Sequence, residues 1–526
     1  MVLTTNSSTS PASATAAAGV FRYGIDRLDL ASVNAIAHGQ LPAVLCEQAI
    51  ANINQSRACV EHMAASSKPI YGINTGFGPL CDTQISPAET ALLQKNLLIT
   101  HAVGVGEPIA KAISKLMLIT KVHALSQGYS GVRLAVVERM LQFIALDLIP
   151  VVPEQGSVGA SGDLAPLSHL FLPLIGEGEF WGKGDSKELL PAADVLAAHG
   201  LAPLELQAKE GLGLINGTQF ILSHAITALS KMQYLLDLAD VAGAMSIEGM
   251  QGSGSPFRPE LHQIRPFAGN IQVAARMRRL FKDSQNMASH TGCARVQDPY
   301  SLRCIPQVHG ASRNAFAHLN AMVEIEMNSV TDNPIVISSE EALSGGGFHG
   351  QPLAMVLDYT SIAAAELGNI SDRRCYLLLE GLHGLPRLLT KAGGLNSGMM
   401  IPQYTTAALV TENKSLCFPP SADSVPTSMG QEDHVSMGSI SGRKLNQILG
   451  NLEKILAIEL MYAAQAIDFR RPNVCSDIIE ENHAIIRAKV AKLEEDRLLK
   501  PDIDAMITLV RQQALRVAFD IHTASN

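Results

Sequence analysis

Apolar residues recur every three or four positions along most of this chain, which is the spacing of one face of an α-helix. Up to residue 150 the repeats are short, and they predict helices over residues 29–38, 43–64, 89–102, 108–127 and 134–148. Later repeats persist for many more turns, over residues 219–251, 311–330, 352–381 and 442–469, and amphipathic segments follow at 477–499 and 502–519. Such long helices cannot bury their apolar faces singly, so the pattern predicts that they pack side by side in a bundle.

The fold class that this pattern predicts is mainly α, and the chain divides into parts of different character. Residues 1–20 carry no charge and are interrupted by Ser, Thr and Pro, which indicates a flexible extension rather than a secretory signal. Residues 21–215 predict a smaller N-terminal part of short helices and loops, with an extended run and a glycine-rich loop at residues 68–80. Residues 216–526 predict the long-helix bundle and the C-terminal helices.

Composition narrows the class of protein further. With 47% hydrophobic and 17% charged residues, the chain has the composition of a folded protein rather than a disordered one. Its 40 Lys and Arg against 49 Asp and Glu give a net charge of −9 without a basic stripe, so we expect no nucleic-acid partner. No apolar run is long enough to span a membrane, and the eight cysteines form no Cys-x-x-Cys pair. We therefore expect a soluble cytoplasmic protein with reduced thiols and no membrane association.

Polar loops that contain glycine separate the predicted helices and differ from ordinary connectors. They lie at residues 71–78, 156–163, 216–219, 297–303, 344–352 and 431–437. Loops held by a rigid scaffold are where function concentrates, so their scatter predicts one composite site, shared between subunits. The chain lacks the Gly-x4-Gly-Lys-Ser/Thr phosphate loop, the His-Glu-x-x-His metal helix and the Gly-x-Ser-x-Gly nucleophile turn. Its 16 histidines include no convincing metal-ligand pair, so we expect no metal site.

The loop GSVGASGD, residues 156–163, admits two interpretations. The simpler one is a tight turn between helices, or a backbone nest for an anion, and composition alone favours it. The alternative is chemical, because Gly162 has an unhindered nitrogen and glycine tolerates compressed backbone geometry. That nitrogen can attack the carbonyl carbon of Ala160 in such a turn. Loss of two waters, one from the Ser161 side chain, then leaves a 4-methylideneimidazol-5-one ring with an electrophilic methylene.

Six blocks of sequence, in order along the chain, bear on this choice: YGINTGFGPL, GSVGASGDLAPLSHL, GLINGTQ, VQDPYSLRC, SGGGFHGQP and QEDHVSM. Together they resemble the signature blocks of the aromatic amino acid ammonia-lyases, over nearly the whole chain. The resemblance implies a helix bundle of the fumarase/aspartase-like type and a 4-methylideneimidazol-5-one formed autocatalytically from Ala160, Ser161 and Gly162. It also implies a homotetramer whose sites combine loops of several subunits, with no diffusible cofactor and no metal.

The resemblance implies a role for each matching polar or aromatic residue. Tyr71 matches the base that removes a β-proton, and a tyrosine with its usual pKa of about 10 needs neighbours that stabilise its phenolate. Arg303 matches the residue that binds the substrate carboxylate, for which a planar guanidinium is suited. Residues that line the prosthetic group and the substrate are matched by Asn216, Gln297, Tyr300 and Phe348. Taken singly, these residues are more simply interpreted as loop-capping, salt-bridge or core residues.

Three residues bear on the choice of substrate. Thr100-His101 stands where the histidine-specific members of the family usually carry Ser-His, and Glu432 matches their glutamate beside the substrate imidazole. An imidazole offers such groups a donor and an acceptor nitrogen, whereas a phenyl ring would leave them without partners. The matches imply deamination of L-histidine to trans-urocanate and ammonia, the first step of histidine degradation. Glu432 by itself would also suit a helix N-terminus.

Two glycines depart from the family pattern. Members usually carry Asn where this chain has Gly347 and Gly430, and the first of these Asn residues helps to bind the substrate carboxylate. Losing such a partner costs roughly 1–3 kcal/mol of binding if nothing replaces it. The alternatives are a tyrosine or phenylalanine ammonia-lyase, a 2,3-aminomutase with the same prosthetic group, or a helical scaffold whose loop never cyclises.

Overall fold

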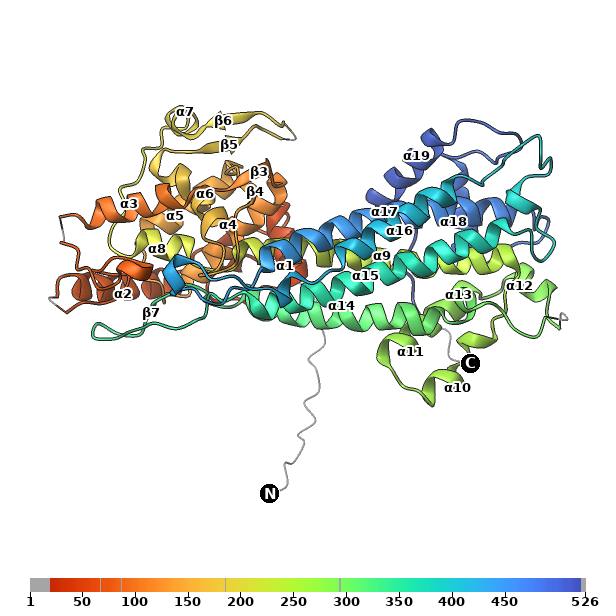
Figure 1. Cartoon of the computed structure of the whole chain (residues 1–526), viewed down its shortest axis with the longest axis horizontal. Helices are drawn as coiled ribbons and strands as arrows, with labels where there is room; N and C mark the ends of the chain where they lie inside the picture. Colours follow the sequence, from red (N-terminus) through yellow and green to blue (C-terminus); the bar gives the residue numbers. More distant parts are fainter. Residues whose placement is uncertain (1–18, 67, 87, 185, 293–294, 522–526) are drawn as a thin grey trace, which may run out of the picture.

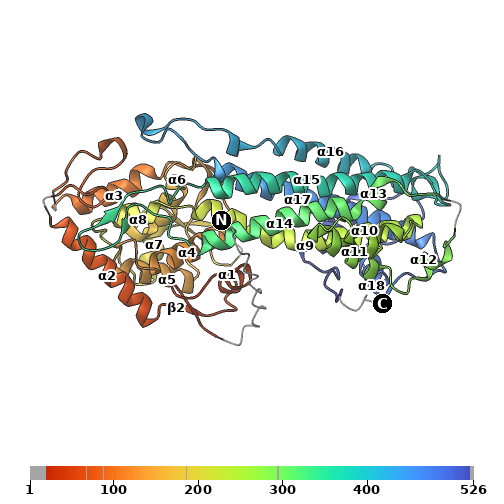
Figure 2. The same cartoon turned by 90° about the horizontal axis from the view of Figure 1, so that it is seen from below.

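The computed structural model of the chain describes residues 19–66, 68–86, 88–184, 186–292 and 295–521. The first eighteen residues of the predicted extension at residues 1–20 lie outside this description. Long helices run side by side along the longest axis of the molecule, and the short N-terminal elements gather at one end (Figure 1, Figure 2). None of the described helices is long and apolar enough to cross a membrane.

The bundle is built from long helices, which confirms the predicted mainly α fold. They are α9 (Gln219–Met250), α14 (Ile305–Met327), α15 (Gln351–Leu379) and α17 (Gly438–Asp468). α17 packs against both α9 and α15, and α14 packs against the same two helices. α16 (Pro402–Leu416), which the periodicity did not predict, covers α15 and α17. Most apolar side chains of α9 and α17 are buried, so these two helices form the centre of the core.

The other helices are shorter, and α4 joins the N-terminal part to the bundle by packing against α9. These α-helices are α1 (Leu30–Ala37), α2 (Glu47–Ala64), α3 (Thr90–His101), α4 (Lys111–Ser126), α5 (Leu134–Ala145), α6 (Leu164–Phe171), α7 (Ala192–Ala198), α8 (Glu210–Ile215), α10 (Pro259–Gln263), α11 (Ala268–Leu280), α12 (Gln285–Ser289), α13 (Tyr300–Arg303), α18 (Asp477–Arg487) and α19 (Lys500–Arg511). Turns of 3-10 helix lie at Gly78–Leu80, Leu172–Ile175, Ser255–Phe257, Arg387–Leu389, Pro420–Ala422 and Ser428–Gly430.

Strands in the described residues are short and pair in twos. The parallel pair is β1 (Phe21–Arg22) with β2 (Ala43–Val44), and the antiparallel pairs are β3 (Val105–Pro108) with β4 (Pro153–Gln155), β5 (Glu179–Trp181) with β6 (Leu189–Pro191), and β7 (Ile335–Val336) with β8 (Ala342–Leu343). The pair of β3 and β4 joins the segment after α3 to the loop at residues 156–163. The extended run predicted within residues 68–80 is not a strand, because this segment forms turns, an isolated antiparallel bridge from Thr75 to Gln84 and a 3-10 helix.

The two C-terminal amphipathic helices are shorter than the sequence predicts. α18 and α19 end at Arg487 and Arg511, well before the predicted residues 499 and 519. After α18 the backbone finds its partners on another helix, since the side-chain oxygen of Gln465 in α17 accepts a hydrogen bond from the Leu493 amide at 3.1 Å. Leu493 is buried in this irregular segment. Its burial explains why the apolar pattern resembled a helix beyond the true helix end.

Buried charges fix how the central helices lie against one another. Arg374 of α15 and Glu459 of α17 are fully buried and form an ion pair, with 2.9 Å between Nη2 and Oε2. Glu459 also accepts hydrogen bonds from the hydroxyls of Ser246 in α9 and Ser371 in α15, at 2.7 and 2.6 Å. A buried charge that loses its partner is costly, so a slide of any of these helices along its axis is opposed.

The helices α9, α15 and α17 begin at the same end of the bundle. A Cβ added to Gly350, just before α15, would lie 2.6 Å from Ile221 in the first turn of α9 and 3.0 Å from Ser436, just before α17. α14 runs the opposite way, because Glu326 near its C-terminus accepts a hydrogen bond from Thr218, just before α9, at 2.5 Å. The loops that precede α9, α15 and α17 therefore meet beside the N-terminal part.

Candidate active site

The loop between β4 and α6 folds back on itself. The backbones of Ala160 and Gly162 pair with each other across Ser161. Gly159 and Gly162 have φ angles of +69° and +75°, which L side chains rarely adopt. A Cβ on Gly162 would lie 2.1 Å from the Gly217 oxygen, so only glycine fits there. The triplet is thus held in a compressed turn that brings the Gly162 backbone toward that of Ala160.

Two other loops hold this turn through backbone hydrogen bonds. The amide of Asp163 donates a hydrogen bond to the Gly217 oxygen at 2.7 Å, which ties the turn to the segment just before α9. The amide of Met437 donates to the Val158 oxygen at 2.9 Å, which ties it to the segment just before α17. Ala160 is buried in a small apolar cluster with Met437. The turn therefore depends on segments that lie far away in the sequence.

Asp163 is a buried acid whose role the sequence does not reveal. Its Oδ2 accepts hydrogen bonds from the amides of Phe220 and Ile221, at 3.1 and 3.0 Å, in the first turn of α9. Its Oδ1 accepts a hydrogen bond from the Ser157 hydroxyl at 3.1 Å. Burial raises the pKa of Asp163 to about 7. The available signal was an acid directly after the triplet, but spacing does not show that it caps a helix more than fifty residues away.

Glu432 lies against Ser161. Its Oε1 accepts a hydrogen bond from the Ser161 hydroxyl at 2.9 Å, and its Oε2 accepts from the hydroxyls of Thr427 and Ser428 at 2.9 and 2.8 Å. The carboxylate is thus held beside the hydroxyl that would leave during cyclisation.

The surroundings of Tyr71, which include the charge of Glu432, shift its pKa in the direction opposite to the one expected for a base. Its side chain is half-buried, and burial raises the pKa of its hydroxyl. A hydrogen bond with the Gly78 backbone lowers that pKa, while the neighbouring Cys81 and the Glu432 carboxylate raise it. The described residues of one chain therefore do not supply the expected stabilisation of the phenolate.

Thr100 and His101 form the C-terminal end of α3. The Thr100 hydroxyl donates a hydrogen bond to the Asn96 oxygen at 2.8 Å, and this residue is exposed. His101 is half-buried, and its Nδ1 lies 2.8 Å from the Leu97 oxygen. Because a carbonyl oxygen can only accept, we assign the ring proton to Nδ1, which leaves Nε2 as an acceptor. His101 can therefore offer Nε2 to a ligand.

Asn216 and Phe348 belong to the loops that meet at the start of the bundle. Asn216 is buried at the end of α8, and its backbone oxygen accepts a hydrogen bond from the buried Lys121 at 2.5 Å. Phe348 is half-buried in the loop just before α15. Both residues are thus carried by segments that converge on the turn at Ala160–Gly162.

The two glycines that depart from the family pattern are not crowded. The nearest atom to a Cβ on Gly347 would be the Val330 oxygen, at 3.7 Å, so an Asn side chain would have room there. Gly430 has a φ of +85°, a conformation that glycine and asparagine both tolerate better than other residues. This explains the Gly430 exchange, whereas no described contact shows what replaces Asn at Gly347.

Gln297, Tyr300 and Arg303 lie at the opposite end of the bundle, around α13 (Figure 1). α9 connects the two regions: it begins next to Gly217, which contacts the turn, and Gln251 at its end lines the same cavity as Arg303. With 32 residues and a rise of 1.5 Å for each, α9 is about 48 Å long. A single copy of the chain therefore cannot bring these three residues to the turn.

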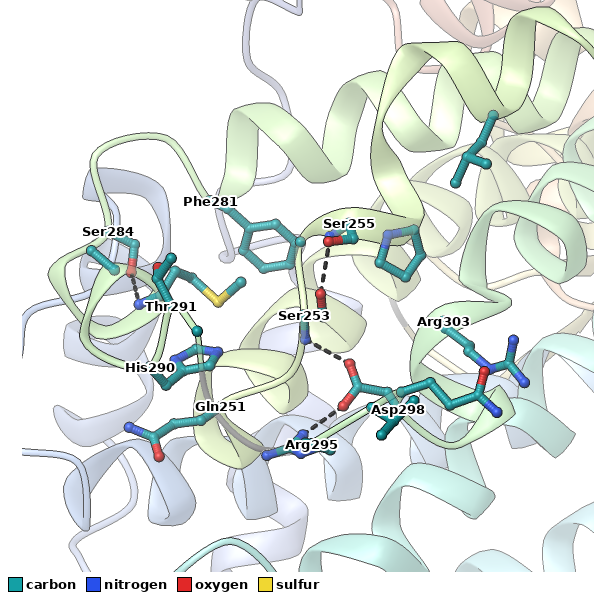
Figure 3. A pocket seen from close by; sticks show the side chains of 18 of the residues that line it. Gln251, Ser253, Ser255, Phe281, Ser284, His290, Thr291, Arg295, Asp298 and Arg303 are labelled. Atoms are coloured by element: carbon teal, nitrogen blue, oxygen red, sulfur yellow. Dashed lines mark hydrogen bonds and ion pairs between the residues drawn. The ribbon is translucent and has the colours of Figure 1, made fainter.

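A cavity of about 1120 Å³ lies beside Arg303 (Figure 3). The guanidinium carbon of Arg303 is 4.6 Å from the centre of the Tyr300 ring. The acid nearby, Asp298, is already occupied, since it accepts hydrogen bonds from Arg295 at 2.5 Å and from the Ser253 amide at 2.6 Å. Arg303 forms no ion pair with any described residue, and its Nε is buried without a partner. It is a cation available to a carboxylate ligand.

The predicted site residues thus fall into two groups. The loop group consists of Tyr71, Thr100, His101, Ala160, Ser161, Gly162, Asn216, Phe348 and Glu432. The cavity group consists of Gln297, Tyr300 and Arg303. The loop group offers a phenol, an imidazole and a carboxylate, the last in contact with the compressed turn, and the cavity group offers a guanidinium that has no ion-pair partner among the described residues. Within the part of the chain that the structure describes, no cluster of His, Cys, Asp and Glu could hold a metal ion.

This chain is similar to known proteins over nearly its whole length. Histidine ammonia-lyase of Symbiobacterium thermophilum is 46% identical over 495 residues, which cover 94% of this chain and 97% of that protein. Histidine ammonia-lyase of Deinococcus radiodurans is 47% identical over 490 residues, which cover 92% and 93%. Both relatives are therefore matched over almost their whole length.

Solved structures match equally well. The crystal structure of histidine ammonia-lyase from Trypanosoma cruzi superposes with a TM-score of 0.86 at 40% identity, covering 94% of each chain. Tyrosine aminomutase from Streptomyces globisporus superposes with a TM-score of 0.89 at 34% identity, covering 94% of this chain and 97% of that one. A family model described as aromatic amino acid lyase matches residues 28–488. The chain belongs to the aromatic amino acid lyase family.

Proposed function

We propose that this protein is a histidine ammonia-lyase, which converts L-histidine to trans-urocanate and ammonia. The observation that carries the proposal is the 2.9 Å hydrogen bond between the Ser161 hydroxyl and the Glu432 carboxylate. It puts a group suited to an imidazole beside the residue from which the family's electrophile would form. The relatives named histidine ammonia-lyase, matched over nearly their full length, support the same substrate for this chain.

The turn fits a 4-methylideneimidazol-5-one formed from Ala160, Ser161 and Gly162. The Gly162 nitrogen would bond to the Ala160 carbonyl carbon with loss of one water, and Ser161 would lose its hydroxyl as a second water. The positive φ of Gly162 and the lack of room for a Cβ there support this assignment. Once formed, the group supplies an electrophilic carbon for the substrate amine. Asn216 and Phe348 would line it.

The chain's own side chains then act on the substrate. The Tyr71 hydroxyl oxygen takes the β-proton, which requires that its pKa, raised by burial within one chain, be lowered in the assembled site. Arg303 of a second copy binds the substrate carboxylate, and its positive charge would lower the pKa of Tyr71. His101 and Glu432 pair with the imidazole nitrogens, and they would lose these partners if the ring were phenyl.

A homotetramer would bring the two groups of residues together. Gln297, Tyr300 and Arg303 of one copy would lie against the loop group of another, with the long helices of the two copies antiparallel. Two observations support this assembly: the length of α9, about 48 Å for its 32 residues, and the Nε atom of Arg303, which is buried without a partner among the described residues. Closed symmetry would give each copy the same pair of half-sites.

Purified protein offered histidine, tyrosine and phenylalanine separately is expected to deaminate histidine fastest. The formation of a conjugated aryl acrylate, followed by ultraviolet absorbance, measures each rate. Chromatography for β-amino acids in the same samples tests for aminomutase activity. Faster turnover of tyrosine or phenylalanine, or a β-amino acid as the main product, would contradict the proposed substrate or reaction.

Glu432→Gln is expected to lower kcat/KM for histidine by about 10- to 100-fold, because a charge-assisted hydrogen bond to the ring is lost. The same change removes a negative charge that raises the pKa of Tyr71. A base works only when deprotonated, so activity falls as pH falls through its pKa. Lowering that pKa moves the acid limb of the pH–rate profile to lower pH.

Steady-state rates from pH 6 to 10 would measure both effects of Glu432→Gln, with Glu188→Gln in the exposed strand connection before β6 as the charge-matched control. We expect the control to keep the wild-type profile. An acid limb that moves to higher pH in Glu432→Gln, or stays in place, would contradict the electrostatic link between Glu432 and Tyr71.

A further inference from the structure

The segment that follows His101 is a tight turn that leads into β3. The amide of Val103 donates a hydrogen bond to the His101 oxygen at 2.9 Å, and Ala102 between them has φ −80° and ψ 67°, the geometry of an inverse γ-turn. The next residue, Gly104, leads into β3, which pairs with β4. The position of the backbone at Gly104 therefore constrains the turn by which the chain leaves His101 at the end of α3.

His169 of α6 holds that backbone. The Gly104 amide donates a hydrogen bond to the Nε2 atom of His169 at 3.0 Å, over 65 residues of sequence. A Cβ on Gly104 would lie 3.2 Å from both the His169 ring and the Gln155 oxygen, so the absence of a side chain permits this close approach. α3 and α6 also pack directly against each other. At this contact the segment after α3 packs against both β4 and α6.

The chemistry of the contact requires a particular form of His169. An amide N–H can only donate, so Nε2 must be unprotonated and the ring must be neutral with its proton on Nδ1. The ring is half-buried, and burial lowers its pKa, which favours the neutral form. Hence the acceptor is present at neutral pH.

We propose that His169 is a positioning residue for substrate recognition: through the Gly104 amide it fixes the turn that orients His101 toward the substrate ring. This inference rests on the proposed function, in which His101 pairs with the imidazole. α6 begins directly after Gly162 and Asp163, so the same helix carries the end of the prosthetic-group turn and the anchor of the ring-binding turn. The distance between the electrophile and His101 is thereby set by the single helix α6.

His169→Leu and His169→Gln separate this role from simple packing. Leucine fills space without an acceptor, whereas the glutamine side-chain oxygen can accept the Gly104 amide. We expect His169→Leu to raise KM for histidine about 5- to 10-fold with less than about a twofold change in kcat, as befits one lost hydrogen bond. We expect His169→Gln to stay within about twofold of wild type in both constants. Equal losses in the two variants would overturn the proposal.

A double-mutant cycle with His101→Ala tests whether His169 acts through His101. In the His101→Ala background, His169→Leu should have no further effect on KM. Additive effects would overturn the proposal, because they would mean that His169 acts elsewhere. His199→Leu, at the exposed end of α7, is the matched control and should leave both constants unchanged.

Two measurements keep the outcome interpretable. Thermal unfolding and intact mass are recorded for every variant, and each should retain the mass deficit of two waters. If His169→Leu does not fold, His169→Phe, which keeps a ring and lacks the acceptor, replaces it under the same criteria. Wild-type protein that does not deaminate histidine would refute the proposed function itself, which is a different result from any pattern among the His169 variants.

Discussion

Ser161→Ala is expected to abolish deamination while leaving the chain folded. Alanine has no hydroxyl to lose, so the methylene carbon of the electrophile cannot form. Without covalent catalysis the turnover should fall by at least about a thousandfold. The fold should survive, because the Ser161 hydroxyl is lost on cyclisation in any case, and in the uncyclised chain its hydrogen bond to Glu432, at 2.9 Å, contributes only about 1 kcal/mol.

Intact mass and thermal unfolding distinguish the loss of chemistry from the loss of structure. Wild-type protein should weigh two waters less than its sequence, and Ser161→Ala should lack that deficit. Ser86→Ala, which removes an exposed hydroxyl from the N-terminal part, should keep both the deficit and the activity. Wild-type rates in folded Ser161→Ala protein, or a wild type without the mass deficit, would refute the prosthetic group.

The long helices could be predicted because their burial repeats with the period of the helix itself. α9 begins at Gln219 and α15 at Gln351, within a residue of the predicted starts, since apolar residues fill their buried faces for many turns. The apolar pattern wrongly predicts helix over residues 488–499, because an irregular segment can also bury apolar side chains at helical spacing. There Gln465 of α17 satisfies the Leu493 amide, a partner that no local pattern reveals.

The site could be predicted as a set of residues but not as an arrangement. Ser161 and Glu432 are separated by 271 residues, and their contact depends on three loops that meet only because α9, α15 and α17 begin together. The capping of α9 by Asp163 has the same origin. The sequence also could not predict the direction of the Tyr71 pKa shift, because that shift depends on burial and on the nearby charge of Glu432.

The separation of the two groups of site residues has a large experimental consequence. Arg303→Ala removes the guanidinium that would bind the substrate carboxylate, and kcat/KM should fall by roughly 100-fold, as for other lost charge-assisted pairs. Ser161→Ala and Arg303→Ala should therefore each be nearly inactive when expressed alone. If every site combines the turn of one copy with the cavity of another, however, a mixture of the two variants contains some intact sites.

Co-expression of Ser161→Ala and Arg303→Ala chains should recover about one quarter of the wild-type activity per chain, since half of the turns and half of the guanidinium groups are intact and they pair at random. Ser161→Ala co-expressed with Tyr71→Phe is the matched control, because both changes fall in the loop group. Chromatography and mass spectrometry would confirm that mixed oligomers form. Activity no higher than that of the separate variants, in verified mixed oligomers, would mean that Arg303 does not serve a turn on another copy. Recovery in the Arg303 pair alone follows only from a shared site, because the two groups lie at opposite ends of α9, which is about 48 Å long.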